Sequence, residues 1–110
     1  MPDTRTLDLD RLRASADRSC ALLKTLSNPD RLLLLCRISQ GECSVGELEE
    51  ALEIHQPTLS QQLGVLRDEG LVDTRRDGKR IYYSIASPEA LALMQVLYEQ
   101  FCAPPARRRR

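Results

Sequence analysis

Thiols are the side chains of this sequence with the most distinctive chemistry. The chain holds one histidine, His55, and four cysteines, Cys20, Cys36, Cys43 and Cys102. A thiol can form a disulfide, react with oxidants or reactive sulfur species, or bind a soft metal. The spacings are irregular, so we expect reduced thiols rather than the disulfide framework of a small secreted protein. A thiol–disulfide enzyme is a weak alternative, because no Cys-x-x-Cys pair occurs and no histidine stands near a thiol to activate it.

Two of these cysteines fall at the edges of apolar helix faces. Cys36 lies roughly 40° beyond Leu32 on a helical projection. Cys102 lies just outside a stripe formed by Leu91, Met94, Leu97, Tyr98 and Phe101. A thiol at such a rim packs as a small hydrophobe yet stays within reach of small oxidants, as a sensor requires. The alternative is two ordinary half-buried cysteines, because free cysteine is commonly buried.

Helices are predicted by capping residues and by apolar periodicity. A helical pattern stops at Ser27, and Asn28 is placed to cap the helix that follows. Ser44 and Glu47 form the pattern of a capping box, and Pro57 begins a fourth helix. The predicted helices span residues 7–26, 29–40, 45–52 and 57–70, and a last helix follows Ser87-Pro88 and ends before Ala103.

A β-hairpin is predicted between the fourth and the last helix. Residues 71–75 and 81–85 are rich in β-branched and aromatic side chains and flank Asp77-Gly78, which is a strong hairpin signal. The order α-α-α-α-β-β-α indicates a mainly α fold with a β-hairpin wing, a winged helix-turn-helix. We expect one domain over residues 1–106, followed by a basic, disordered tail at Arg107 to Arg110.

Composition argues against membrane and secreted classes. The longest wholly apolar run of the 110 residues, Leu32 to Cys36, is too short for a membrane span or a secretory signal, so we expect a cytoplasmic protein. The formal net charge is zero, but residues 41–54 hold five glutamates and no basic residue, whereas residues 71–86 hold four basic residues and two acidic ones. A neutral chain of this kind can still present a basic edge to nucleic acid.

The fourth helix and the hairpin together carry candidate DNA contacts. Leu59, Leu63 and Leu66 recur at i, i+4 and i+7 and must face the core, which leaves polar side chains outside. Glutamine, threonine and serine can bind base edges, and the candidate base contacts are Gln56, Thr58, Ser60, Gln61 and Gln62. Basic side chains neutralise phosphates, and the candidate backbone contacts are Arg67, Arg75, Arg76, Lys79 and Arg80. The alternatives are a solvated helix face and a winged helix that binds only protein.

A series of short motifs spans residues 28–85. They are Asn28-Pro29 with Arg31-Leu32, Ser44-Val45 with Glu47-Leu48, Thr58 to Leu63, Leu66-Arg67, Gly70 to Val72, and Gly78 to Arg80 with Tyr82-Tyr83. With these motifs the chain resembles the ArsR/SmtB family of dimeric winged-helix repressors. The resemblance implies a homodimer, joined through its first and last helices, that binds double-stranded operator DNA. Two residues depart from the family pattern. Gln62 stands where many relatives have His, and Gly64 stands where many have Lys.

The family resemblance does not identify the inducer, because its members carry ligand sites on different helices. Zinc sensors of the family need Asp, His and Glu ligands in the last helix, where residues 88–102 offer only Glu89 and Glu99. His55 lies at the turn before the fourth helix and is interpreted as a residue that flanks the helix. We therefore expect neither a metal nor any other cofactor.

A metalloid sensor remains an alternative. Metalloid sensors of the family carry Cys-x-Cys at the start of the third helix, where this chain has Ser44 and Gly46. Cys43 lies one position earlier, and an arsenite-type site could combine it with Cys20 or Cys36.

Cys36 and Cys102 resemble the cysteine pair of the BigR/SqrR/HlyU branch of the family. One thiol lies in Leu-Leu-Cys of the second helix, and the other closes the last helix in Tyr-x-x-Phe-Cys. The resemblance implies a repressor of sulfide-detoxification, biofilm or virulence genes that releases DNA when a disulfide or polysulfide joins the pair. We therefore expect a metal-independent repressor whose inducer is a persulfide, a polysulfide or an oxidant. Cys20 and Cys43 are interpreted as structural or accessory.

Overall fold

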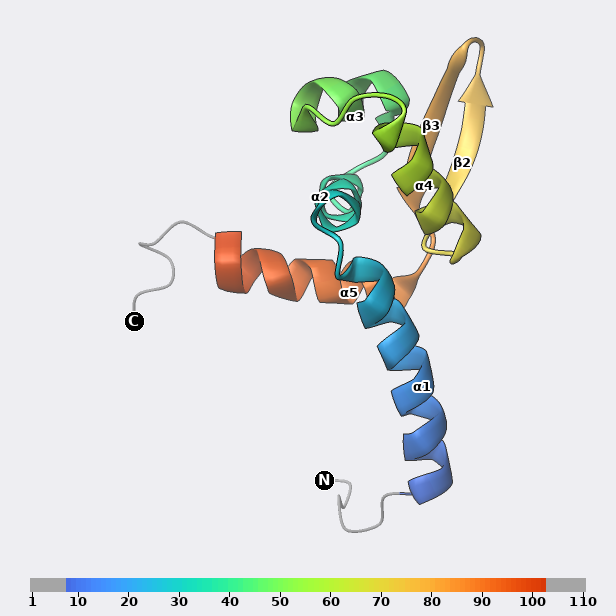
Figure 1. Ribbon diagram of the computed structural model, residues 1–110, viewed down its shortest axis with the longest axis vertical. Coiled ribbons are helices and arrows are strands. Elements are labelled where there is room, and N and C mark those ends of the chain that lie inside the picture. The colour runs from blue at the N-terminus through green and yellow to red at the C-terminus, as the bar shows by residue number, and fades with distance from the viewer. Residues whose placement is uncertain (1–7, 103–110) are drawn as a thin grey trace.

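The computed structural model describes residues 8–102 and confirms the winged helix-turn-helix. Its elements are α1 (Leu9–Leu26), α2 (Pro29–Ile38), β1 (Cys43–Ser44), α3 (Val45–Leu52), α4 (Thr58–Asp68), β2 (Val72–Asp77), β3 (Arg80–Ile85), α5 (Pro88–Leu97) and the π-helical turn η2 (Tyr98–Cys102). Figure 1 shows α2, α3 and α4 gathered beside the hairpin. The predicted tail at Arg107 to Arg110 and both ends of the predicted domain lie outside the described residues.

Capping side chains begin four of the helices, at Asp8, Asn28, Ser44 and Ser87, and those at Asn28 and Ser44 are predicted by the sequence. Asn28 accepts a hydrogen bond from a backbone N–H in the first turn of α2, at 3.1 Å, and Ser87 does the same for α5 at 3.1 Å. Ser44 and Glu47 form both bonds of the capping box that begins α3, at 3.1 and 2.8 Å. The helix ends differ slightly from prediction, since α2 stops at Ile38 and Pro57 precedes the first residue of α4.

The wing belongs to a three-stranded antiparallel sheet in the order β1-β3-β2. The predicted turn joins β2 to β3, and Gly78 occupies it with a φ of +67°, a conformation that glycine adopts without strain. β1 was not predicted, because a strand of two residues has no periodicity to detect. It pairs Cys43 with Tyr83 and so ties the start of α3 to the base of the wing.

Leucines from α2, α3 and α4 form most of the core. The predicted inward face of α4 is confirmed, because Leu59, Leu63 and Leu66 are at most 1% exposed. The other fully buried side chains are Leu34, Leu35, Ile38, Leu48, Met94 and Cys43. Burial of one such leucine is worth about 1.5–3 kcal/mol relative to leaving it in water. α4 is therefore fixed to the body by its apolar face, which leaves its polar face available.

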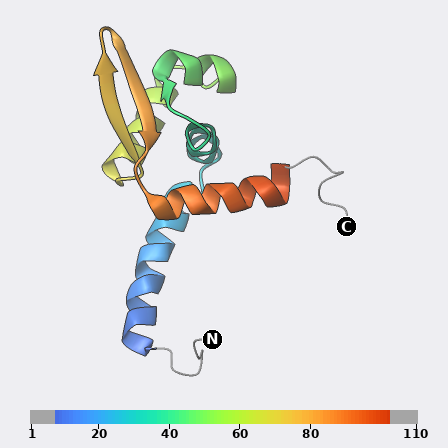
Figure 2. The ribbon, with the colours of Figure 1, turned by 180° about the vertical axis from the view of Figure 1, so that it is seen from behind.

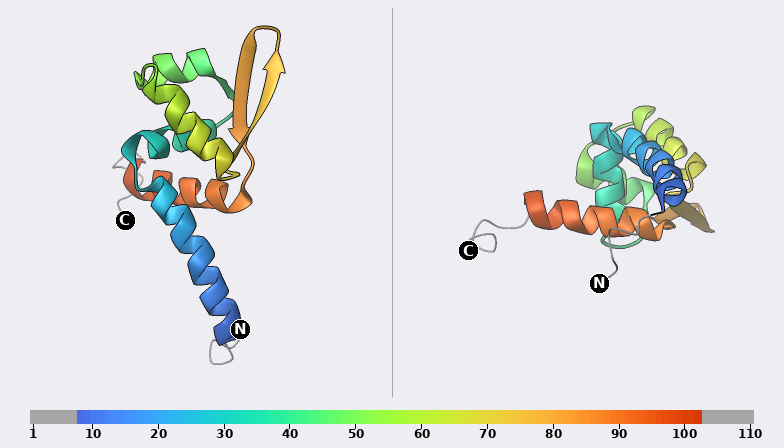
Figure 3. Two further views of the ribbon diagram at one scale, coloured as in Figure 1. Left: turned by 45° about the vertical axis from the view of Figure 1, so that its right-hand side comes forward. Right: turned by 90° about the horizontal axis from the view of Figure 1, so that it is seen from below.

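α1 and α5 extend away from this body in different directions (Figures 1 and 2). Figure 3 shows the same arrangement in an oblique view and from below. Large apolar side chains along both extensions are exposed in the single chain, at Leu9, Leu12, Leu23, Val96, Tyr98 and Phe101. Phe101 belongs to the predicted apolar stripe of the last helix, yet it is 75% exposed. Large apolar side chains exposed in number along two helices are typical of an interaction surface. Within residues 8–102, no helix is both long enough and apolar enough to cross a membrane.

Candidate nucleic-acid interface and thiol site

The start of α4 exposes most of the predicted base contacts. Gln56, Ser60 and Gln61 are exposed, and Thr58 is half-buried. Pro57 offers no capping side chain, and Gln56 supplies one instead, because its Oε1 accepts a hydrogen bond from the Ser60 backbone N–H at 3.1 Å. Ser60 and Gln61 thus lie in the first exposed turns of the second helix of the helix-turn-helix, the part that meets base edges in this fold.

Gln62 differs from the expectation that it projects outward. Its side chain is half-buried, and its Oε1 accepts a hydrogen bond from Nη1 of Arg31 at 2.8 Å. The physical reason is the arginine on α2, which offers a charged donor to an amide oxygen on α4. Sequence spacing alone does not predict this contact, because the two residues are 31 positions apart.

Arg75 of the wing is exposed but forms an ion pair with another residue of the chain. Its guanidinium makes two hydrogen bonds to the carboxylate of Glu42, at 2.7 and 2.8 Å, and lies 4.5 Å from the ring centroid of Tyr82. The hydrogen bond to Glu42 is the main reason why the pKa of Arg75 is raised. Glu42 was missed in the sequence analysis, where it counted only as part of an acidic segment.

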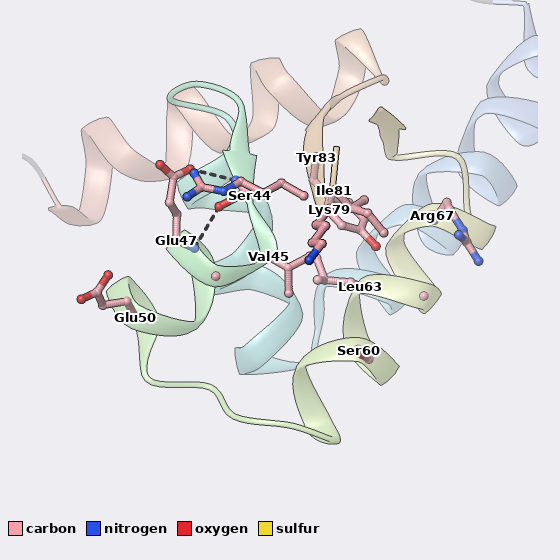
Figure 4. Close-up of a pocket in the computed structure, with 13 residues that line it drawn as sticks. Ser44, Val45, Glu47, Glu50, Ser60, Leu63, Arg67, Lys79, Ile81 and Tyr83 are labelled. Atoms are coloured by element: carbon pink, nitrogen blue, oxygen red, sulfur yellow. Dashed lines mark hydrogen bonds between the residues drawn. The ribbon is translucent and has the colours of Figure 1, made fainter. Parts of the chain in front are cut away.

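Three of the remaining basic candidates line a cleft between the helix-turn-helix and the wing. This cleft, of about 690 Å³, is lined by parts of α3, α4 and the hairpin, including Arg67, Lys79 and Arg80. Figure 4 shows Lys79 on the wing side and Ser60 and Arg67 on α4. Arg67, Arg76, Lys79 and Arg80 are all exposed. Arg67 lies on α4 itself and the other three lie on the wing beside it, where basic side chains can neutralise phosphates.

Cys36 lies on α2, which packs against α5, and Cys102 ends the π-helical turn η2 that continues α5. Cys36 is half-buried against the core, and Cys102 is exposed. Burial raises the pKa of the Cys36 thiol, and the negative charge that Cys102 carries as a thiolate raises it further. Cys102 is thus near enough to Cys36 for its charge to act on the Cys36 thiol.

The other two thiols have different environments. Cys43 is buried in β1, and its thiol donates a weak hydrogen bond to the Gly41 carbonyl at 3.4 Å. This burial does not favour the alternative of a metalloid site at Cys43. Cys20 is exposed on α1. Among residues 8–102, no three His, Cys, Asp or Glu side chains gather as metal ligands would, and the ring of His55 contacts Glu49 at 3.1 Å.

Comparison with known proteins identifies the family. Residues 28–74 match the family model described as bacterial regulatory protein, arsR family. The biofilm growth-associated repressor of Agrobacterium fabrum is 53% identical over 102 residues, which are 93% of this chain and 87% of that protein. This chain belongs to the ArsR family. Family membership places it among DNA-binding transcription regulators rather than enzymes.

Solved structures of ArsR-family proteins share the whole fold. The crystal structure of the transcriptional repressor BigR from Xylella fastidiosa superposes with a TM-score of 0.81 at 49% identity, covering 89% of this chain and all of that one. A homodimeric winged helix-turn-helix DNA-binding domain from Mycobacterium bovis, a possible ArsR-family regulator, gives a TM-score of 0.69 at 34% identity and covers 83% and 84% of the two chains. The predicted resemblance to the ArsR family and to BigR is confirmed.

Proposed function

We propose that this ArsR-family protein is a homodimeric, metal-independent repressor that releases a pseudo-palindromic operator when Cys36 and Cys102 are bridged. The inducer is a reactive sulfur species or an oxidant. The observation that carries the proposal is the placement of a half-buried Cys36 on α2, which packs against α5, and an exposed Cys102 in the turn that continues α5, close enough for the charge of Cys102 to raise the pKa of Cys36. The repressor names of the Agrobacterium and Xylella relatives support the direction of regulation.

DNA binding is assigned to α4 and the wing. Gln56, Thr58, Ser60, Gln61 and Gln62 are the proposed base contacts, and Arg67, Arg75, Arg76, Lys79 and Arg80 are the proposed backbone contacts. α4 enters the major groove with its exposed N-terminal residues, while the hairpin lies along the flanking phosphates. Arg75 contributes least to phosphate binding, because Glu42 already neutralises it.

The homodimer is assigned to the apolar surfaces that α1 and the α5–η2 segment leave exposed. In the single chain, Leu9 on α1 is 61% exposed and Phe101 in η2 is 75% exposed. A second copy that covers these surfaces would remove them from water, at about 25 cal/mol for each Å² of apolar area buried. The homodimeric relative from Mycobacterium bovis supports this arrangement. Two copies of α4 can then reach successive major grooves, about 34 Å apart.

The proposed bridging reaction uses the sulfane sulfur of a persulfide as its oxidant. The exposed Cys102 thiolate attacks the donor's outer sulfur, gains that sulfur as a persulfide, and expels the donor as a thiolate. The Cys36 thiolate then attacks the inner sulfur of this persulfide and expels hydrosulfide, which leaves a Cys36–Cys102 disulfide. Overall, the two thiols lose two electrons and two protons, and one sulfane sulfur becomes hydrogen sulfide. A peroxide gives the same disulfide with water as the reduced product.

Bridging changes DNA affinity through the position of α5 relative to α2. A disulfide requires the two Cα atoms to lie within about 7 Å, so it fixes the end of α5 and η2 against α2. In the dimer this segment belongs to the interface that sets the distance between the two α4 helices. A coupling of about 1–3 kcal/mol would lower operator affinity between 5- and 150-fold.

Mass spectrometry tests the chemistry directly. The full chain would be treated in parallel with a persulfide donor, with peroxide and with oxidised glutathione, and then digested without reduction. The expected product is a cross-linked peptide pair that joins Cys36 to Cys102, with or without added sulfur. The Cys43→Ser protein is the matched control and should give the same pair. A dominant cross-link through Cys43 would contradict the proposal.

A further inference from the structure

Arg31 connects α2 to two other helices through one guanidinium. Its Nε donates a hydrogen bond to the Thr25 carbonyl at 2.7 Å, and its Nη1 donates one to Oε1 of Gln62 at 2.8 Å. Thr25 lies in the last turn of α1, and Gln62 lies on α4 beside the exposed Gln61. A single half-buried side chain therefore joins the extended helix α1, the thiol-bearing helix α2 and the recognition helix α4.

Both acceptors suit an arginine. The Thr25 carbonyl is one of the last four of α1, and such carbonyls have no partner within their own helix. The Gln62 amide oxygen is an acceptor on a different helix, α4. The planar guanidinium offers several donors at fixed angles, so it can serve both acceptors at once, whereas a lysine ammonium on a flexible stem holds two separate acceptors less well.

The position of Arg31 on α2 gives these bonds a second consequence. Cys36 lies five residues further along the same helix, within reach of the charge of Cys102 in η2. A helix moves largely as a unit, so a displacement of α2 relative to α4 that follows bridging also moves the Arg31 guanidinium. A hydrogen bond of 2.8 Å weakens when its atoms separate beyond about 3.2 Å, so a small shift is enough to break the contact with Gln62.

We propose that Arg31 is a positioning residue that holds α4 in its DNA-binding orientation and transmits the state of Cys36 to α4 through Gln62. This inference rests on the proposed function and deepens it. In the reduced protein, Arg31 holds Gln62 and adds to the constraint that the buried leucines place on the rotation of α4 about its axis. In the bridged protein, the bond is lost and Gln61 and its neighbours no longer meet the base edges together.

The test measures operator affinity of the full chain by fluorescence anisotropy, before and after treatment with a persulfide donor. Arg31→Met removes both bonds, and Arg31→Lys keeps the charge but not the planar pair of donors. Arg37→Met is the control, because Arg37 is a half-buried arginine on the same helix. Both Arg31 variants are expected to lose about tenfold in reduced affinity, and the ratio of reduced to treated affinity should fall towards one. The control should keep the ratio of the parent.

Two variants at Gln62 separate positioning from base contact. Gln62→Met removes the acceptor, so the ratio of reduced to treated affinity should fall towards one, as it does for Arg31→Met. The double variant should bind operator no more weakly than either single variant. Gln62→Glu keeps an acceptor for Arg31 while it loses the amide donors, so it should bind operator more weakly yet retain the ratio. Because Gln62→Met decides the same point, the test does not depend on the folding of Arg31→Met.

Three outcomes are decisive. The inference is overturned if Arg31→Lys and Gln62→Met respond to persulfide with the ratio of the parent, or if the effects of Arg31→Met and Gln62→Met on reduced affinity simply add. It is also overturned if these variants lower the melting temperature but leave the ratio intact, which is the behaviour of a purely structural contact. A parent protein that ignores persulfide refutes the proposed function instead, and additivity in the reduced proteins then still decides whether Arg31 acts through Gln62.

Discussion

Arg75 in the wing and Glu42, just before β1, form a two-pronged ion pair with nitrogen–oxygen distances of 2.7 and 2.8 Å. The hydrogen bond from Arg75 holds the pKa of the Glu42 carboxyl below its usual range, so the carboxylate stays ionised to lower pH than an ordinary glutamate. A DNA phosphate must therefore compete with Glu42 for this guanidinium. The pair also attaches one strand of the wing to the segment that leads into α3.

Replacement of Glu42 should strengthen binding to all DNA. Glu42→Gln removes the competing charge, so operator and random DNA should both bind a few-fold more tightly at low salt, because one more phosphate can be neutralised. The slope of log affinity against log salt should steepen by up to about 1. Salt titrations would measure this, with Glu53→Gln as the control that removes a charge without releasing an arginine. An unchanged slope would show that Arg75 does not reach phosphate even when it is released.

Gln61 should carry base discrimination rather than general affinity. Its side chain is exposed on α4, and a well-placed contact to a base edge is worth about 1–3 kcal/mol of discrimination. Gln61→Ala should therefore flatten the preference among operator variants while affinity for random DNA changes little. Gln95→Ala, an exposed glutamine on α5, is the control. If the variant ranks an operator library as the parent does, Gln61 is not among the base contacts.

Ser44 should contribute measurably to stability. It is 5% exposed and makes both bonds of the capping box of α3 with Glu47, so Ser44→Ala should cost about 1 kcal/mol. Ser60→Ala, at an exposed position, should stay within about 0.5 kcal/mol of the parent. Denaturant unfolding at one fixed protein concentration would compare them, since the stability of a dimer depends on concentration. Equal midpoints for the two variants would contradict the assigned role of the cap.

Reaction at Cys36 should accelerate as pH rises. Burial raises the pKa of this thiol and Cys102 adds to the shift, so below that pKa the reactive thiolate increases about tenfold for each pH unit. Cys102→Ser removes the added charge, which should lower the pKa of Cys36 and make it react faster at a given pH. An uncharged disulfide reagent and peptide mapping would give the two pH–rate profiles. A Cys36 profile in the parent that matches a cysteine in a short unfolded peptide would contradict the burial argument.

Local signals allowed most of the fold to be predicted from the sequence. Asn28, Ser44 and Ser87 act as caps within three residues of their partners, and the Asp77-Gly78 turn sets the hairpin, so each can be recognised without tertiary information. β1 could not be predicted, because its two residues become a strand only by pairing with β3. The π-helical turn at the end of α5 likewise has no signal in the apolar spacing.

The candidate site could be predicted only in part, for a related reason. Residue type and helical phase indicated the exposure of Gln61 and the half-buried position of Cys36. The contacts of Gln62 with Arg31 and of Arg75 with Glu42 join residues 31 and 33 positions apart, so they depend on how the helices and the wing pack. Gln62 and Arg75 were expected to be free to bind DNA, whereas each already has a hydrogen-bond partner within the protein.

Operator retention by cysteine variants tests the central claim most directly. Parent, Cys36→Ser, Cys102→Ser and Cys43→Ser proteins would be bound to operator and treated with a persulfide donor. Serine is close in shape to cysteine and none of the three substituted cysteines lies on α4 or the wing hairpin β2–β3, so all four reduced proteins should bind alike. The parent and Cys43→Ser proteins should release the DNA. Cys36→Ser and Cys102→Ser should stay bound, because a bridge needs both sulfurs. Release by Cys102→Ser together with retention by Cys43→Ser would contradict the central claim and would favour sensing through Cys43.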